Sequence, residues 1–187
     1  MTLVLASRSP QRRALLTQLG LAFRVIDPDY VEQALALAPH ELAERHSRGK
    51  ALSVAAGAGE TVLGVDTVVV IGGQVLGKPA DATEAARMLA LLAGRAHEVV
   101  SGLTLHDDLG TDTAHARTRV RFRPLDAAAI DDYVARGEWR GRAGAYAIQE
   151  AGAALVTGID GDFFNVVGLP VALLVAMLAE RRSRVSG

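Results

Sequence analysis

The stretch TVLGVDTVVVI, residues 61–71, decides the fold class of this chain. It is rich in β-branched side chains, which favour an extended backbone, and its length and apolar content are typical of a central strand. Gly72 and Gly73 follow it. Because glycine tolerates the positive φ angles of tight turns, these two residues predict a hairpin into the segment QVLG, residues 74–77. The sequence therefore predicts a long central strand that ends in a tight hairpin.

Predicted strands and helices alternate on both sides of this strand. Strand-like segments lie at residues 2–6, 21–26, 97–105 and 114–122, and helical segments lie at 10–19, 39–56, 81–94, 126–137 and from Pro170 onward. Ser9, Asp81 and Asp126 are expected to be N-caps. The last helix contains LPVALLVAMLAE, whose composition predicts burial against a sheet, whereas the glycine-rich segment 141–153 is expected to be irregular. This interleaving predicts an α/β or mixed α+β fold.

The composition is that of an ordinary soluble protein. Half of the 187 residues are hydrophobic and 22% are charged, and the net charge of −1 gives no global field toward nucleic acid or a membrane. The absence of cysteine excludes disulfides and thiolate metal sites. The late apolar run at residues 166–179 is shorter than the roughly 20 residues that span a bilayer. We expect one cytoplasmic domain over residues 1–182, followed by a flexible tail over residues 183–187.

The segment SRSPQRR, residues 7–13, joins the first strand to the first helix and carries unusual charge. Ser9 and Pro10 suit the N-cap and the first helical position. Arg12 and Arg13 then fall in the first turn, where the helix dipole already disfavours cations. An anion would relieve this conflict, so the segment, with the hydroxyl of Ser7, predicts a phosphate cradle. The alternative is a surface helix with solvated arginines.

Asp66 is the second unusual residue, because it interrupts the predicted central strand. An unpaired buried carboxylate would cost several kcal/mol, so we expect a cation beside Asp66 or a position at a cleft. A purely structural role, paired with an arginine or capping a bulge, is the alternative. Lys50 lies on the same helical stripe as Ala43, Ser47 and Val54, which places it toward the packed face, although lysines there usually extend to the rim.

Other motifs are excluded by their details. The segment GGQVLGK, residues 72–78, has the spacing of a P-loop, but Pro79 stands where the magnesium-binding Ser or Thr is required. Lys78 remains a charge near the end of the hairpin. The histidines lack metal-ligand spacing, and no nucleophile elbow or dinucleotide fingerprint is present. The remaining carboxylates, lysines and arginines suit metal-assisted chemistry on phosphates.

Six segments, taken in order, resemble the Maf family of nucleoside triphosphate pyrophosphatases: LASRSPQRRALL, GVDTVVV, LGKP, AGRAHEVVSG, GRAGAYAIQ and IDGDFFNVVGLP. The resemblance spans residues 3 to about 180. It implies an α/β fold similar to that of the inosine triphosphate pyrophosphatases, a mixed twisted sheet with flanking helices and two lobes around a deep cleft, often as a homodimer. It also implies hydrolysis of a nucleoside triphosphate to the monophosphate and pyrophosphate with a divalent cation, Mg²⁺ or Mn²⁺.

The resemblance also implies site residues. Asp66 is the position that the family assigns as proton acceptor, and Glu32 is a candidate metal-binding partner for it. Lys78 and, on a looser local match, Lys50 are the other implied catalytic residues, which spread positive charge over the polyanion. Ser7, Arg13 and Gln149 are implied to bind the substrate. Ser9 and Arg12 join them as expected donors to the triphosphate oxygens.

Substrate preference is implied by three positions. The branch of the family that cleaves dTTP and UTP has arginine after Ser-Pro, threonine after the catalytic aspartate and glutamine in the YGIQ segment. This chain has Thr67 and Gln149 but carries Gln11 at the first position. It lacks the aromatic residue after Ser-Pro of the branch that favours 7-methyl-GTP, which stays an alternative substrate. The chain also departs from the family at three further positions, where the family more often has lysine and glycines: Arg142, Ala147 and Glu150.

Two other function classes remain open. One is a nucleotide-sensing regulator of cell division with little turnover. The other is a phosphosugar or nucleotidyl-transfer enzyme, which would need a second substrate. Release of pyrophosphate in water distinguishes hydrolysis from both.

Overall fold

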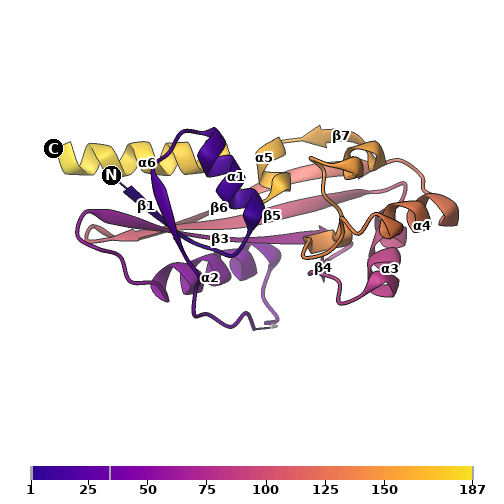
Figure 1. The fold of residues 1–187 in the computed structure, drawn as a ribbon, viewed down its shortest axis with the longest axis horizontal. Helices are drawn as coiled ribbons and strands as arrows, with labels where there is room; N and C mark the ends of the chain where they lie inside the picture. Colours follow the sequence, from indigo (N-terminus) through magenta and orange to yellow (C-terminus); the bar gives the residue numbers. More distant parts are fainter. Residues whose placement is uncertain (1, 34, 187) are drawn as a thin grey trace. The chain divides into compact units, whose positions relative to one another are not determined.

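The computed structural model describes residues 2–33 and 35–186 (Figure 1). In these residues seven strands form one mixed sheet in the order β2-β1-β3-β5-β6-β7, with β4 paired to β3. The strands are β1 (Thr2–Ala6), β2 (Phe23–Ile26), β3 (Glu60–Ile71), β4 (Gln74–Leu76), β5 (Ala96–Asp107), β6 (Gly110–Phe122) and β7 (Val156–Asp160). Strand β1 is parallel to β2 and β3, whereas β4 and β7 are antiparallel to β3 and β6. The predicted mixed sheet with flanking helices is confirmed.

The helices are α1 (Pro10–Gln18), α2 (Pro39–Leu52), α3 (Ala82–Leu92), α4 (Ala127–Ala135), α5 (Phe163–Val167) and α6 (Val171–Ser186), with 3-10 turns at Ala143–Ala145 and Ala151–Leu155. The three predicted N-caps are confirmed. Ser9 accepts a hydrogen bond from the backbone N–H of Arg12, and Asp81 and Asp126 accept from the N–H groups three residues further on. Each cap satisfies a donor that the first helical turn leaves unpaired.

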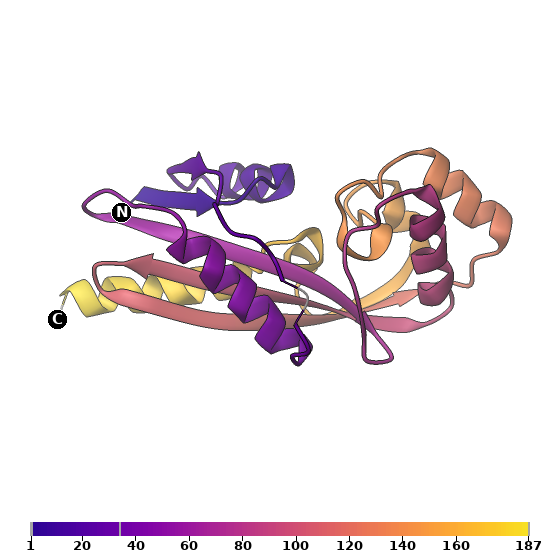
Figure 2. The ribbon, with the colours of Figure 1, turned by 90° about the horizontal axis from the view of Figure 1, so that it is seen from below.

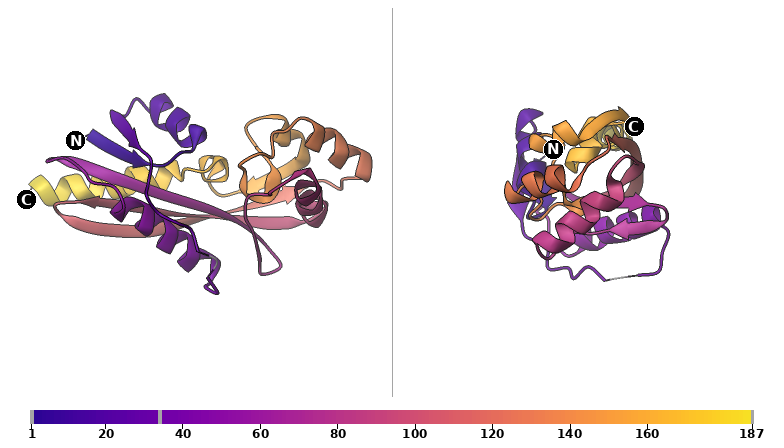
Figure 3. Two further views of the ribbon diagram at one scale, coloured as in Figure 1. Left: turned by 60° about the horizontal axis from the view of Figure 1, so that its bottom comes forward. Right: turned by 90° about the vertical axis from the view of Figure 1, so that its right-hand side faces the viewer.

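The chain divides into two compact units. Unit 1 comprises Met1–Asp66, Ser101–Ala116 and Gly168–Gly187, and unit 2 comprises Thr67–Val100 and Arg117–Val167. In unit 1, Figure 2 shows α2 running along β3, and a small apolar cluster includes Val4, Val54 and Val62. In unit 2, Figure 3 shows α3 and α4 side by side, and they contribute to a larger core with buried residues such as Leu89 and Ile130.

The hairpin after β3 forms as predicted. Gly72 and Gly73 have φ angles of +56° and +81°, and β4 pairs antiparallel with β3 through Val70 and Val75. These positive angles match the twist of a two-residue hairpin turn, which residues with a Cβ adopt only with strain.

The turn between β5 and β6 is shorter than the sequence predicts, because the strands run to Asp107 and from Gly110. A buried arginine of α6 explains the difference. Arg181 pairs with the carboxylate of Asp107 and donates from Nη2 to the carbonyl oxygens of Leu105 at 2.8 Å and Gly110 at 2.9 Å. These bonds satisfy polar groups at the end of the hairpin, so segments that look like a polar loop in sequence remain extended.

Helix α6 is only partly buried, which corrects the expectation from its composition. Leu174, Met177 and Leu178 are buried, whereas Val175 is 54% exposed. The helix continues through the expected tail to Ser186, and Gly187 lies outside the described residues. Across the part of the chain that the structure describes, none of the helices combines the length and hydropathy that a membrane crossing requires.

Candidate active site

The loop between β1 and α1 places its polar side chains close together. Ser7 is buried, and its Oγ accepts a hydrogen bond from the backbone N–H of Ser9 at 3.2 Å. The hydroxyl of Ser9 donates to Oε1 of Gln11 at 3.0 Å. The loop is therefore ordered by its own side chains at the point where it enters the helix.

Arg12, rather than Arg13, points into unit 1. The Arg12 side chain is buried, with Nη1 donating to Ser7 Oγ at 3.1 Å and Nε donating to the carbonyl oxygen of Gly168 at 2.9 Å. Burial lowers the pKa of the Arg12 guanidinium, and the negative charges of Asp66 and Glu32 oppose that shift. Both carboxylates belong to the predicted site, and their negative charge favours the protonated form of this buried guanidinium.

Arg13 has a different environment. It is exposed on α1, and the described residues include no hydrogen-bond or ion-pair partner for its side chain. The sequence placed both arginines in the phosphate cradle. The structure brings Arg12 to Ser7 and leaves Arg13 in solvent, so the role of Arg13 stays a prediction.

Lys50 joins two carboxylates from distant parts of the sequence. Its Nζ lies 2.5 Å from Oδ1 of Asp66 and 2.6 Å from Oε1 of Glu32. Lys50 and Asp66 are 8% and 6% exposed, whereas the Glu32 side chain is 47% exposed. The cation expected beside Asp66 is therefore present, and it is a lysine of α2.

Two glycines let α2 approach the sheet closely enough to make this contact. A Cβ at Gly64 of β3 would overlap the carbonyl oxygen of Ser47 and lie 2.8 Å from the backbone nitrogen of Ala51. A Cβ at Gly102 of β5 would overlap the backbone of Ala43. Gly64 and Asp66 are two residues apart and share one face of β3, so the close approach at Gly64 brings Lys50 to Asp66.

Glu32 lies on the irregular segment between β2 and α2, and Tyr30 holds this segment on α2. The Tyr30 hydroxyl is 3.0 Å from Nδ1 of the buried His46. The Tyr30 ring occupies the space where Gly49 would carry a Cβ. Because Tyr30 is only two residues before Glu32, this contact places the Glu32 carboxylate near Lys50.

Glu32 and Asp66 are also the residues that could hold a cation. Among residues 2–33 and 35–186, no three His, Cys, Asp or Glu side chains form a complete metal-binding group. Mg²⁺ usually keeps several waters and is bound by one or two carboxylates together with substrate phosphates. Two carboxylates that meet at a single ammonium group fit that pattern, since a phosphate-bearing ligand would supply the remaining oxygens.

The other predicted residues belong to unit 2. Thr67 follows Asp66 on β3, and its side chain alternates to the opposite face of the strand. Lys78 is exposed just after β4. The neighbouring residue Gly77 accepts a hydrogen bond through its carbonyl oxygen from the N–H of Gly144 at 3.1 Å, which ties the Lys78 loop to the 141–153 segment.

Gln149 lies in a turn with a fixed backbone. The N–H of Ala147 donates to the buried Tyr133 hydroxyl at 3.0 Å, and the N–H of Glu150 donates to the carbonyl oxygen of Ala147 at 3.1 Å. The Gln149 side chain is exposed, with Nε2 donating to Oε1 of Glu150 at 3.2 Å. Arg142 donates to the same carboxylate oxygen at 3.2 Å.

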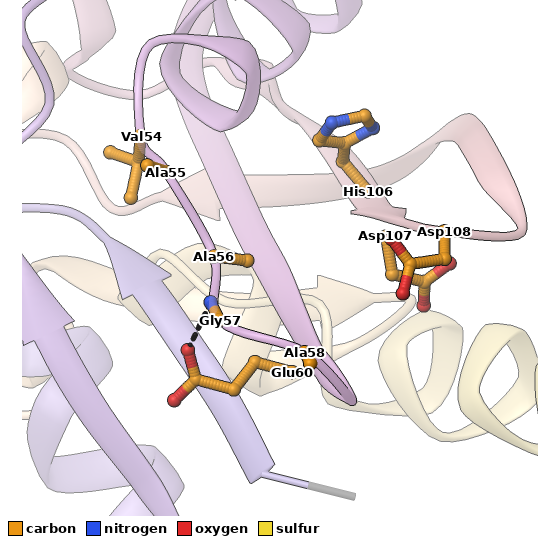
Figure 4. A pocket seen from close by; sticks show the side chains of 9 residues that line it. All are labelled: Val54, Ala55, Ala56, Gly57, Ala58, Glu60, His106, Asp107 and Asp108. Carbon is orange, nitrogen blue, oxygen red and sulfur yellow. Dashed lines mark hydrogen bonds between the residues drawn. The ribbon is translucent and has the colours of Figure 1, made fainter.

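A separate cavity in unit 1 contains none of the predicted site residues. Its volume is about 450 Å³, and its lining is Val54, Ala55, Ala56, Gly57, Ala58, Glu60, His106, Asp107 and Asp108 (Figure 4). Two of its acids already have strong partners. Glu60 accepts from the N–H of Gly57 and from Arg24, and Asp107 pairs with Thr61 and Arg181.

The structure therefore brings together Ser7, Ser9, Gln11 and Arg12 where the β1–α1 loop enters α1, and Glu32, Lys50 and Asp66 in one charged cluster. Sequence reasoning missed the residues that position this cluster, namely Tyr30, His46, Gly49, Gly64 and Gly102. An isolated glycine within a strand often marks a close backbone approach, so Gly64 was the available signal.

The match to a family model and the matches to individual proteins point to the same protein family. A sequence model of the family described as Maf-like protein matches residues 2–181. Proteins named dTTP/UTP pyrophosphatase from Symbiobacterium thermophilum and Moorella thermoacetica are 48% and 49% identical over 180 and 182 residues, each alignment covering 95% of this chain and 93% of the relative. The protein of the same name from Gloeobacter violaceus is 47% identical over 186 residues, 98% of this chain and 97% of that protein.

A solved structure supports the fold. The structure of a HAM1 protein from Coxiella burnetii matches with a TM-score of 0.53 at 19% sequence identity, covering 96% of this chain and 99% of that chain. This likeness confirms the predicted α/β fold class.

Proposed function

Because this chain belongs to the Maf-like protein family, we propose that it hydrolyses nucleoside triphosphates, dTTP and UTP above others, to the nucleoside monophosphate and pyrophosphate. Relatives that are 47–49% identical to this chain are named dTTP/UTP pyrophosphatase, and the alignments cover nearly their whole length. The observation that carries the proposal is the buried Asp66 carboxylate, which contacts the Lys50 ammonium group that also contacts Glu32. Fixed charges of this kind suit the electrostatic stabilisation that phosphoryl transfer requires.

In this proposal the loop before α1 binds the triphosphate. Ser7 and Ser9 supply hydroxyl donors, and Arg12 supplies a guanidinium that the loop already orients through Ser7. Arg13 and Lys78, both exposed, add positive charge that neutralises the polyanion.

Asp66 is the proposed proton acceptor. The oxygen of a water molecule forms a bond to the α-phosphorus, the bond from that phosphorus to the bridging oxygen of the leaving pyrophosphate breaks, and the proton of the water passes to a carboxylate oxygen of Asp66. The hydrogen bond from Lys50 to Oδ1 holds that carboxylate in place. A divalent cation held by Glu32 and Asp66 would neutralise phosphate oxygens and lower the pKa of a bound water.

The base preference is proposed from Thr67, Gln149 and Gln11. The first two match the dTTP/UTP branch, whereas Gln11 departs from it and has its side-chain oxygen engaged by Ser9. A panel of canonical triphosphates and 7-methyl-GTP, with wild type compared with Gln11→Arg, tests this assignment. An unchanged preference in Gln11→Arg removes the specificity role of that position.

Pyrophosphate release from UTP and dTTP with Mg²⁺ or Mn²⁺ is the direct test of the activity. We expect release of pyrophosphate and the monophosphate in water, without a second substrate. Binding of triphosphate without release would favour a nucleotide sensor, and turnover that requires a second substrate would favour a transfer enzyme.

The proposal includes a homodimer, which sedimentation at two protein concentrations tests.

A further inference from the structure

The orientation of the Gln149 side-chain amide is set by its neighbours, a feature separate from the proposed contact of Gln149 with the base. Its Nε2 donates to Glu150 Oε1, and the same oxygen accepts from Arg142 Nη2. An ionised carboxylate only accepts hydrogen bonds, whereas a carboxamide has a donor end and an acceptor end. Glu150 therefore determines which end of the Gln149 amide faces it.

The acceptor end of Gln149 is left available by this arrangement. With Nε2 turned toward Glu150, Oε1 points away from that carboxylate, and it accepts no hydrogen bond from the residues that the structure describes. A reversed amide would place Oε1 against the Glu150 carboxylate, where two acceptors repel each other, and would lose the bond to Nε2.

The backbone of the turn that carries Gln149 is also restrained. Hydrogen bonds from Ala147 to Tyr133 and from Glu150 to Ala147 fix the backbone before and after Gln149. The N–H groups of Ala151 and Gly152 both donate to the Glu138 carboxylate at 3.3 Å. Arg142, whose side chain is 19% exposed, in turn restrains Glu150, whose side chain is 44% exposed.

We propose that Arg142 and Glu150 are positioning residues for base selection, because they engage the nitrogen end of the Gln149 amide and leave its carbonyl oxygen to meet the base, which favours a base whose ring nitrogen carries a proton. Uracil and thymine present an N3–H donor between two carbonyl oxygens. Cytosine presents an unprotonated N3 at the same place, so the carbonyl oxygen of Gln149 would face a second acceptor and form no hydrogen bond. This inference rests on the proposed function, in which Gln149 contacts the base of a pyrimidine triphosphate.

The test is the ratio of kcat/KM for UTP to kcat/KM for CTP. Removing a negative charge near a polyanionic substrate changes both values alike, and the ratio cancels that effect. In Glu150→Gln and Glu150→Ala the amide is free to turn, so we expect the ratio to fall about fivefold, the size of one exposed charge-assisted hydrogen bond. Arg142→Met should lower the ratio by about twofold, and Arg142→Lys should restore most of it.

Asp131→Asn is the matched control, because it removes an exposed carboxylate of α4 in the same unit and should leave the ratio at the wild-type value. A ratio that stays at the wild-type value in both Glu150 variants, while pyrophosphate release persists, overturns the inference and leaves the proposed function intact. A wild-type enzyme that cleaves UTP and CTP equally also overturns it. A wild-type protein that releases no pyrophosphate from any triphosphate overturns both.

Discussion

Lys50 of α2 donates a hydrogen bond to Asp66 of β3, with 2.5 Å between Nζ and Oδ1. Both side chains are nearly excluded from solvent. Truncating Asp66 would leave the buried Lys50 ammonium without this hydrogen-bond acceptor, which is strongly destabilising. An amide of the same shape keeps an acceptor for Lys50, and Glu32 remains as its counter-ion. A test of the carboxylate's chemistry therefore needs an isosteric substitution.

Asp66→Asn is that substitution. The asparagine side-chain oxygen can still accept from Lys50, but the amide cannot take a proton from water. We expect the rate of pyrophosphate release to fall at least 100-fold, which corresponds to roughly 2.7 kcal/mol of transition-state stabilisation. Asp108→Asn, an exposed carboxylate of the same unit, is the control and should keep the wild-type rate. Unchanged turnover in Asp66→Asn would exclude Asp66 from the mechanism.

Tyr30 and Gly49 give a second prediction, because their contact places Glu32 near Lys50. A methyl group at position 49 would overlap the Tyr30 ring, so Gly49→Ala should displace the segment that carries Glu32. We expect kcat/KM to fall about tenfold and the Mg²⁺ concentration for half-maximal activity to rise, since Glu32 is a proposed cation ligand.

Tyr30→Phe separates packing from hydrogen bonding in the same contact. It keeps the ring and removes only the hydroxyl that contacts His46, so its effect should be smaller than that of Gly49→Ala. Arg48→Ala, at an exposed position of the same helix, is the control for general effects on α2. If Gly49→Ala shows the wild-type dependence on Mg²⁺, Tyr30 does not position Glu32.

Gly64 gives a prediction about stability. An alanine there would overlap the backbone of α2 at Ser47 and Ala51, and a rigid backbone yields less readily than a side chain. Gly64→Ala should lower the free energy of unfolding in urea by about 1–3 kcal/mol, the usual cost of overpacking. Gly77→Ala introduces the same methyl group where no atom lies within 4 Å, and should change stability little. Equal stability of the two variants would show that α2 does not depend on the space at Gly64.

The parts of the structure that depend only on residues close together in the sequence could be predicted from it. The strand at 61–71, the Gly72-Gly73 hairpin and the Ser9 cap each follow from local backbone preferences. Strand β7 and helix α5 were not predicted, because residues 156–167 show neither a clear two-residue nor a clear 3.6-residue period. Their places depend on pairing with β6 and on buried contacts such as that of Asn165 with Val99.

The candidate site shows the same limit. The sequence indicates that Asp66 needs a cation, because burying a lone carboxylate is costly, but it does not identify Lys50 as that cation. Nothing near Glu32 in the sequence marks it, since its position depends on the packing of Tyr30 on α2. Arg12 and Arg13 look equivalent in the sequence, and only the rotation of α1 about its axis determines that Arg12 is the buried one.

His97 gives a pH-dependent prediction that is independent of the active site. Burial lowers its pKa to about 4, and its ring contacts the Tyr146 hydroxyl and packs in a T-shaped arrangement with the ring of Phe122. In the unfolded chain a histidine binds a proton near pH 6.5, so between pH 6.5 and 4 the unfolded state holds more protons and stability falls as pH falls. From pH 7 to pH 5 this linkage should lower the free energy of unfolding by about 2 kcal/mol. His97→Gln does not titrate, so urea unfolding at the two pH values should show a drop smaller by that amount. An equal drop in wild type and variant would mean that another group causes the acid sensitivity.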